Sequence, residues 1–533
     1  MALARRTWEP GSMERHPVSR AAGWRWPAFV IATLSLLTVP PILVAALATP
    51  SASVFSGYVV IARDAFVYQA MWRDGWRGAW LFHPAFTSES LPGILLYPWY
   101  LWPAHLLGWA AGPWLYHITR VAAAAALLGA VWLLIAELFR PRRLRRWAFV
   151  LCALGGGVGV LLPAGLHFGP WTPRATEMVS PGSSLADLIA MAPHLAWALA
   201  LMCWTMVVAL RLRRRPRWWL AASGVVAVLG LELIYPQLAL LAVAAIGTWA
   251  LVRRHRPASW FGAVSALVQL PYLAYLFWLW QTAPAALRVI RPALDVGDPF
   301  GFLVLSHLVA SVLIVVAIWR RRLRGDLLLP ALWIAGMTLF MFTPGISGTL
   351  GRSFMASSVP FGLCAAPGLL ALLRMVRRPR WRRRVLTVTL AASSIFGLFS
   401  LAQPFWIAAF RLDPYAEYES ADEAALLARL APDVSRRDIV LTTYLDGVFI
   451  PAQTDARAFN GHPDMTIDAA RKSADALAFF TTWSAAEGTE FLRANHITYV
   501  LTTNAQFRNR IGKDAPLILV DRQGSAELYK VPH

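Results

Sequence analysis

The sequence predicts an α-helical polytopic membrane protein with about eleven membrane-spanning helices and a small α/β soluble domain at its C-terminus. Three observations lead to this fold class. The 533-residue chain is 57% hydrophobic and only 15% charged, with a mean hydropathy of +0.50, whereas soluble domains are typically about 25% charged. Short arginine clusters separate apolar stretches of spanning length. Most acidic residues lie after position 411.

The arginine clusters predict how the chain crosses the membrane. The net charge is +21, but the basic residues fall in short clusters between apolar stretches, so we expect no nucleic-acid partner. Loops rich in arginine stay on the cytoplasmic side of a membrane. We therefore place in the cytoplasm the clusters within 5–25, 140–146, 211–217, 253–256, 320–324 and 374–384.

The membrane part is expected to cover 26–411, after a cytoplasmic tail of residues 1–25. Ala46-Leu47-Ala48 fits a signal-peptide cleavage pattern, but the apolar stretch 26–48 exceeds the usual core of about 7 to 15 residues, so we expect an uncleaved first span. The later spans are expected at 117–139, at four hairpins (147–166 with 184–210, 218–234 with 236–252, 258–280 with 300–319, 326–345 with 355–373) and at 385–410.

Residues 49–116 form a long first outer loop in this topology. Within it, 92–109 carries Tyr97, Trp99, Tyr100 and Trp102, and such aromatic side chains favour the boundary between membrane and water. We expect this segment to lie on or shallowly in the outer leaflet, with a kinked crossing as the alternative.

The tail, 412–533, has the composition of a soluble domain. It holds 17 of the 29 acidic residues. Apolar periodicity predicts helices at 420–430, 467–482 and 485–495 and strands at 438–443 and 497–503, with 517–520 and 527–531 as edge strands. This alternation indicates a small α/β domain on the extracytoplasmic side. The tail has no glycine-rich nucleotide loop, so we expect no nucleotide cofactor.

The acidic residues of the membrane part gather on the outer side. Of the twelve, only Glu9, Glu14, Glu137 and Asp326 are expected in the cytoplasm. Basic and imidazole groups share the outer side. A carboxylate base among cations that bind anions suits attack on a sugar carried by a phosphate or pyrophosphate, because the base activates the acceptor while the cations stabilise the departing phosphate.

Several motifs resemble the GT-C superfamily of polyprenyl-phosphate-sugar glycosyltransferases, which includes protein O-mannosyltransferases and lipid A aminoarabinose transferases. Arg63-Asp64-Ala65-Phe66, followed by Tyr68, lies just after the first span, where those enzymes carry a catalytic Asp. The segments similar to a subgroup of uncharacterised bacterial members are 82–89, 97–98, 116–120, 192–194, 351–354, 461–462 with Lys472, 479–480 and 497–500.

The resemblance implies that Asp64 is the catalytic residue, acting as general base; a helix cap is the alternative. Glu89 and Glu177 also fit solvated loop acids, His194 a histidine hydrogen-bonded within the helix bundle, and Arg352 an anchor for lipid headgroups. Candidates for substrate binding are Arg63, His83, Glu89, Arg174, Glu177, His194 and Arg352.

A metal or other cofactor is not expected. Asp64 lacks the second acid two residues further on that would complete an acidic metal-binding pair of the GT-C type. Cys152, Cys203 and Cys364 all lie in apolar stretches, away from any place where a thiolate metal site or disulfide is expected. In the tail, His462 and Asp464 next to Gly461 form the one polar cluster of interest, and the pattern favours a turn there over a functional site.

Two classes of function follow. The first is a glycosyltransferase of the cytoplasmic (inner) membrane that takes a polyprenyl-phosphate-linked sugar from the outer leaflet and passes it to an unknown protein, lipid or glycan acceptor. The second is a transporter or flippase of a lipid-linked envelope intermediate, which would use the same arginines without bond cleavage. Transporters typically show paired repeats and polar groups near the bilayer midplane, and the sequence shows no convincing repeat. A structural scaffold for envelope glycans is a third possibility.

Overall fold

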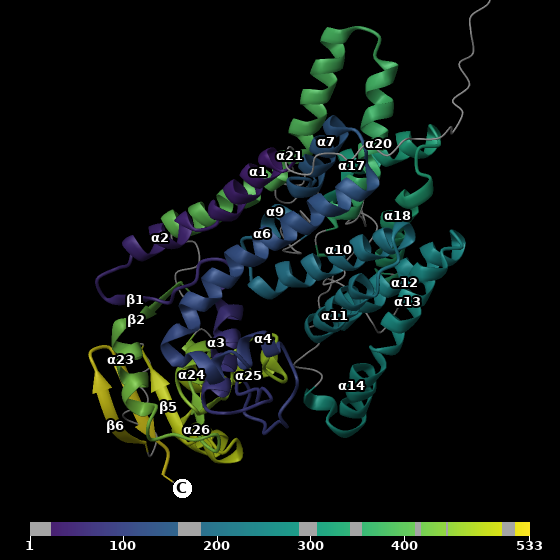
Figure 1. Cartoon of the computed structure of the whole chain (residues 1–533). Helices are drawn as coiled ribbons and strands as arrows, with labels where there is room; N and C mark the ends of the chain where they lie inside the picture. The colour runs from purple at the N-terminus through teal and green to yellow at the C-terminus, as the bar shows by residue number, and fades with distance from the viewer. Residues whose placement is uncertain are drawn as a thin grey trace, which may run out of the picture.

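The computed structural model describes residues 23–157, 183–286, 306–341, 354–355, 357–410, 417–443, 446–503 and 517–532. These residues form a bundle of helices with a mixed α/β domain attached at one end (Figure 1). At that end, the loop that follows the first helices packs against the C-terminal segment, so two parts of the chain that are far apart in sequence form one layer.

Six helical segments of the described residues are long and apolar enough to cross a membrane. Two of them are interrupted near a proline in the first turn of the second half, because proline lacks an N–H and clashes with the preceding turn. The first is made of α1 (Arg25–Leu36) and α2 (Pro40–Leu47), and another of α13 (Arg256–Leu267) and α14 (Leu270–Thr282). The remaining four are Trp109–Leu138, which contains α6 (Gly112–Leu138), and α10 (Pro193–Arg214), α20 (Ser358–Met375) and α21 (Pro379–Phe410).

Shorter apolar helices complete the bundle. They are α11 (Trp218–Ile234), α12 (Pro236–Val252), α17 (Leu308–Trp319) and α18 (Leu328–Met341). The stretch expected at 147–166 begins as α7 (Arg142–Ala153), and its second half lies outside the described residues. The structure confirms a helical membrane protein, while the total of eleven spans stays a prediction.

The segment 92–109 forms two single-turn helices, α4 (Pro98–Leu101) and α5 (Ala104–Leu107). Four helical residues rise about 6 Å, whereas the hydrocarbon core of a bilayer is about 30 Å thick. Neither helix can therefore cross the membrane. The depth at which this segment lies stays a prediction.

A two-stranded sheet ties together the residues that follow the first and the last spans. Strand β1 (Ser53–Phe55) pairs antiparallel with β2 (Tyr418–Ser420), with Val54 opposite Glu419. Next to this sheet, α2 packs against α21. The start of the first outer loop and the start of the tail are thus held side by side (Figure 1).

The tail is a small α/β domain, as the sequence predicted. Its five-stranded sheet has the order β4-β3-β5-β7-β6, in which β3 is parallel to both β4 and β5, and β7 is antiparallel to both β5 and β6. The expected helices and strands lie within two residues of their predicted starts. The elements are α23 (Ala421–Leu430), β3 (Ile439–Leu441), α24 (Phe449–Gln453), β4 (Arg457–Ala458), α25 (Ala469–Thr481), α26 (Ala485–Ala494), β5 (Tyr499–Thr502), β6 (Ile518–Gln523) and β7 (Ala526–Lys530).

Candidate functional site

Asp64 lies in the first turn of a helix that the sequence analysis did not predict, α3 (Ala62–Trp76). The helix begins after Ile61, which has the left-handed backbone conformation with φ of 49°, an unfavourable conformation for a β-branched residue. The free N–H groups at a helix N-terminus favour a nearby negative charge. The Asp64 side chain is 45% exposed, so the structure presents a carboxylate that is electrostatically favoured and still accessible.

His462 from the C-terminal domain contacts Asp64. Its Nε2 lies 3.1 Å from Asp64 Oδ1, and its side chain is only 4% exposed. The other ring nitrogen, Nδ1, accepts a hydrogen bond from the backbone N–H of Asp464 at 3.1 Å. Because Nδ1 accepts, the proton of the neutral ring lies on Nε2. His462 therefore donates to Asp64 Oδ1.

The first outer loop holds the turn that carries His462. The carbonyl oxygen of Phe86 accepts hydrogen bonds from the Gly461 N–H at 3.2 Å and from Thr466 Oγ1 at 2.6 Å. One residue further on, Thr87 Oγ1 accepts from the Ile467 N–H at 3.1 Å. These bonds connect the loop to both ends of the turn. The position of His462 relative to the loop is therefore set by backbone groups and two threonine hydroxyls.

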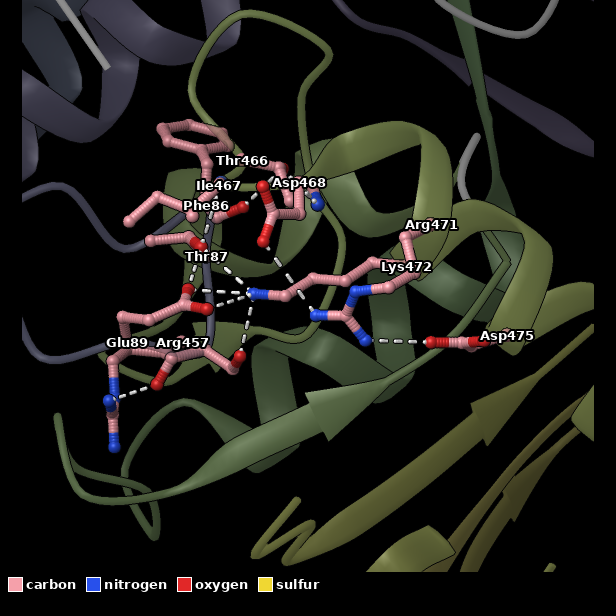
Figure 2. Close-up of polar contacts among 12 residues, drawn as sticks. Phe86, Thr87, Glu89, Arg457, Thr466, Ile467, Asp468, Arg471, Lys472 and Asp475 are labelled. Carbon is pink, nitrogen blue, oxygen red and sulfur yellow. Dashed lines mark hydrogen bonds and ion pairs between the residues drawn. The ribbon is translucent and has the colours of Figure 1, made fainter. Parts of the chain in front are cut away.

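A buried lysine makes a second link between loop and tail (Figure 2). The Nζ of Lys472, on α25, lies 2.8 and 2.7 Å from the two carboxylate oxygens of Glu89 and 2.8 Å from Ser88 Oγ. Burial lowers the pKa of Lys472 despite this ion pair. For Glu89 the effect of partial burial, which raises a carboxyl pKa, is outweighed by the hydrogen bonds from Lys472 and Thr87, so its pKa is lowered.

Charged side chains of α3 make further links to the tail. Asp74, whose side chain is 4% exposed, pairs with Arg436 and also accepts from the His83 N–H at 2.9 Å. Burial raises the pKa of Asp74, although Arg436 and the His83 N–H oppose the shift. Asp455 in the tail pairs with Arg73 at 2.9 Å and with Arg77 at 3.1 Å. One face of α3 is thus neutralised by the C-terminal domain.

A cavity of about 440 Å³ adjoins α3 on the membrane side. It lies between α3, the short helices α4 and α5, and the long helices α6 and α10, and it is predominantly apolar and aromatic. Tyr68 follows Asp64 by one helical turn, so the two residues share a face of α3. Lining residues include Tyr58, Tyr68, Trp72, Trp99, Tyr100, Leu107, Tyr116, Thr119, His194, Trp197 and Leu201.

His194 lies in this cavity wall, within a cluster of tyrosines. Its Nδ1 is 2.8 Å from the Tyr100 hydroxyl and its Nε2 is 2.9 Å from the Tyr235 hydroxyl. A neutral imidazole donates from one nitrogen and accepts at the other, so one tyrosine donates to the ring and the other accepts from it. This arrangement fits the alternative of a histidine hydrogen-bonded within the bundle, and substrate contact stays a prediction.

Comparison with known proteins gives matches among solved structures alone. No protein family and no curated protein sequence matches the chain. An oligosaccharyltransferase from Archaeoglobus fulgidus, solved with zinc and sulfate, has a TM-score of 0.49 at 12% identity, covering 87% of this chain and 67% of that one. ArnT from Cupriavidus metallidurans, solved with undecaprenyl phosphate, has a TM-score of 0.44 at 12% identity, covering 96% of this chain and 100% of that one.

The structure brings together some of the residues singled out from the sequence. Arg63 is half-buried on α3 beside Asp64, whereas His83 and Glu89 lie at the contact between loop and tail. Arg174, Glu177 and Arg352 lie outside the described residues. Within the described residues, no group of three or more His, Cys, Asp and Glu side chains could hold a metal ion.

Two features of the site were missed. The sequence favours a turn at His462, whose approach to Asp64 crosses 398 residues of sequence. Only the recurrence of Gly461-His462 in the family resemblance points to it. Of the tyrosines around His194, the sequence assigns Tyr97 and Tyr100 to the membrane–water boundary, because aromatic residues favour that position in any membrane protein.

Proposed function

We propose that the chain is a membrane glycosyltransferase of the GT-C type. It moves a sugar from a polyprenyl-phosphate donor to an acceptor on the outer face of the cytoplasmic membrane, with Asp64 as general base. One observation carries this proposal: an accessible carboxylate, oriented by a neutral histidine, lies one helical turn from Tyr68, which lines an apolar cavity of about 440 Å³.

The carboxylate suits the reaction. Asp64 would take the proton of an acceptor hydroxyl, whose oxygen attacks the anomeric carbon of the sugar while the bond from that carbon to the phosphate oxygen breaks. The products are the glycosylated acceptor and polyprenyl phosphate, and the configuration at the anomeric carbon inverts. Arg63, adjacent to Asp64, and the predicted Arg174 and Arg352 are the cations proposed to stabilise the departing phosphate.

The cavity suits the lipid part of the donor. Trp99 and Leu107 come from the loop, and Trp197 and Leu201 from a helix long enough to span the membrane. An isoprenoid chain placed among these side chains buries apolar surface, which is worth about 25 cal/mol per Å². The reacting phosphate would then lie at the end of the cavity that is next to the first turn of α3.

Transfer by purified protein in liposomes tests this function. A panel of polyprenyl-phosphate sugars is supplied together with an envelope extract as the source of acceptors, and the release of polyprenyl phosphate is measured. We expect release by the wild type and a rate about 10²- to 10⁴-fold lower for Asp64→Asn, the range typical for loss of a general base. Asp433→Asn, which changes an exposed aspartate of the tail, is the matched control and should remain active.

The same experiment separates the transferase from the flippase. Intact lipid-linked sugar that moves between leaflets without release of polyprenyl phosphate would favour the flippase. Equal release by Asp64→Asn and the wild type would exclude Asp64 as the base.

A further inference from the structure

We propose that His462 is a positioning residue for Asp64, so that the C-terminal domain completes the catalytic site of the membrane part. This inference rests on the proposed function above. It gives the tail a role in catalysis, through one side chain that reaches α3 across the contact between loop and tail.

The hydrogen bond between the two residues has a fixed direction. Nδ1 of His462 is occupied by the Asp464 N–H, so Nε2 is the nitrogen that donates to Asp64 Oδ1. With one oxygen bound in this way, Oδ2 is the atom left to accept the proton of an acceptor hydroxyl. The buried ring also packs edge-on against Phe86, with the ring centroids 6.1 Å apart, which limits its rotation.

Asp64 needs such a partner because of where it lies. A carboxylate in the first turn of a helix can turn back to accept the free N–H groups of that turn. The N-cap residue Ile61 offers no side-chain cap of its own, so these N–H groups compete for Asp64. The hydrogen bond from His462 keeps the Asp64 side chain from turning back to cap the helix, which is the purely structural role for an aspartate at this position.

Hydrogen bonds around His462 restrict the position of its backbone in the C-terminal domain. Asn460 pairs with Thr87 as an isolated β-bridge, and its side chain donates to Ser473 Oγ on α25 at 2.9 Å. The His462 N–H donates to Thr466 Oγ1 at 3.0 Å, and the same hydroxyl donates to the Phe86 carbonyl. A catalytic group must be held to within about 0.5 Å of its productive position, and neighbouring groups that are themselves hydrogen-bonded provide this precision.

Three substitutions of His462 separate positioning from folding. His462→Gln keeps a donor near the place of Nε2, whereas His462→Asn keeps an acceptor near the place of Nδ1, and so keeps the turn, but is too short to reach Asp64. His462→Ala removes both. We expect kcat to fall about tenfold to hundredfold in His462→Asn and His462→Ala, with KM for the donor unchanged. In His462→Gln, kcat should recover. His496→Asn, at an exposed histidine of the same domain, is the matched control.

The outcomes are distinct. A folded His462→Asn variant with wild-type kcat, or a His462→Gln variant as slow as Ala, would overturn the inference. If the wild type transfers sugar, Asp64→Asn is inactive and all three His462 variants keep full kcat, the positioning role fails and the proposed function stands. If Asp64→Asn is as active as the wild type, Asp64 is not the general base, and the positioning role of His462 fails together with that part of the proposed function.

Discussion

Lys472 and Glu89, 383 residues apart in sequence, form an ion pair in which the two partners are buried to very different degrees. The ammonium group belongs to a residue that is 1% exposed, whereas the Glu89 side chain is 38% exposed. The charge that cannot return to water is therefore that of Lys472. Removing one partner costs most when the group left behind is the buried one.

Glu89→Gln should therefore destabilise the contact between loop and tail more than Lys472→Met does. We expect Glu89→Gln to cost about 3 kcal/mol, because it leaves a buried ammonium without a counter-charge. Thermal unfolding of the purified variants in detergent measures both effects. Arg471→Met is the matched control, since Arg471 pairs with Asp475 at the surface and such pairs contribute less than about 1 kcal/mol. Equal costs for the Glu89 and Lys472 variants would contradict this account.

Arg436→Ala should loosen the tail, because it leaves the carboxylate of Asp74 buried without its cation. The expected cost is about 3 kcal/mol. Asp74→Asn in the same chain removes the uncompensated charge, so the double variant should be more stable than Arg436→Ala alone. Limited proteolysis of the tail and thermal unfolding measure the stability of the single and the double variant. A double variant destabilised by the sum of the effects of Arg436→Ala and Asp74→Asn would show that the uncompensated charge of Asp74 is not the cause.

Stability at the junction of loop and tail should fall as pH rises towards neutrality. Burial raises the pKa of Glu419 on β2 from 4.5 to about 7; the hydrogen bond from Gln453 opposes this shift, and the charge of Asp446 adds to it. Burial also raises the pKa of Glu423 on α23. The folded state then binds more protons than the unfolded state between pH 4.5 and 7. The stabilisation is complete below pH 4.5 and is lost as pH rises through about 7.

Glu419→Gln tests this pH dependence directly, because a neutral amide keeps the shape without the proton. The variant should gain up to about 3 kcal/mol over the wild type at pH 8, the free energy that corresponds to the raised pKa, and should differ little at pH 4.5. Unfolding curves at several pH values measure the difference. A parallel pH dependence in wild type and variant would assign the effect to other groups.

Narrowing the cavity should affect donors with long lipid chains. Thr119, on α6, lines the cavity, and Thr119→Trp places a large ring in its lumen. We expect KM for a long-chain polyprenyl-phosphate sugar to rise about tenfold, with KM for a short-chain analogue almost unchanged. Transfer assays with the two donors give the comparison. An equal rise for both would place the lipid elsewhere.

Hydropathy and arginine clusters predicted the helical membrane part because the membrane imposes a local requirement: each spanning segment must be apolar along its length. The tail was also predictable, since α25 and α26 show helical periodicity and β5 is an apolar strand between polar segments. In both cases a short window of sequence carries the signal.

Helix α3 shows where such reasoning stops. Arg63, Asp64, Arg73 and Asp74 interrupt its apolar pattern. The helix is nevertheless largely buried because Arg436 and Asp455 compensate two of these charges and His462 donates a hydrogen bond to a third. Those partners come from the other end of the chain, and no local pattern records them. The candidate carboxylate was therefore predictable by resemblance, but its environment was not.

The pairing of β1 with β2 and of Asp64 with His462 also determines when the candidate site can form. The 398 residues that separate the two side chains take a ribosome roughly 20 to 80 seconds to make, at about 5 to 20 residues per second. Throughout that interval Asp64 has no histidine partner. Asp64 can acquire its hydrogen bond only after α21 and the first half of the C-terminal domain have been made, so a chain interrupted earlier in synthesis would lack the pairing of Asp64 with His462.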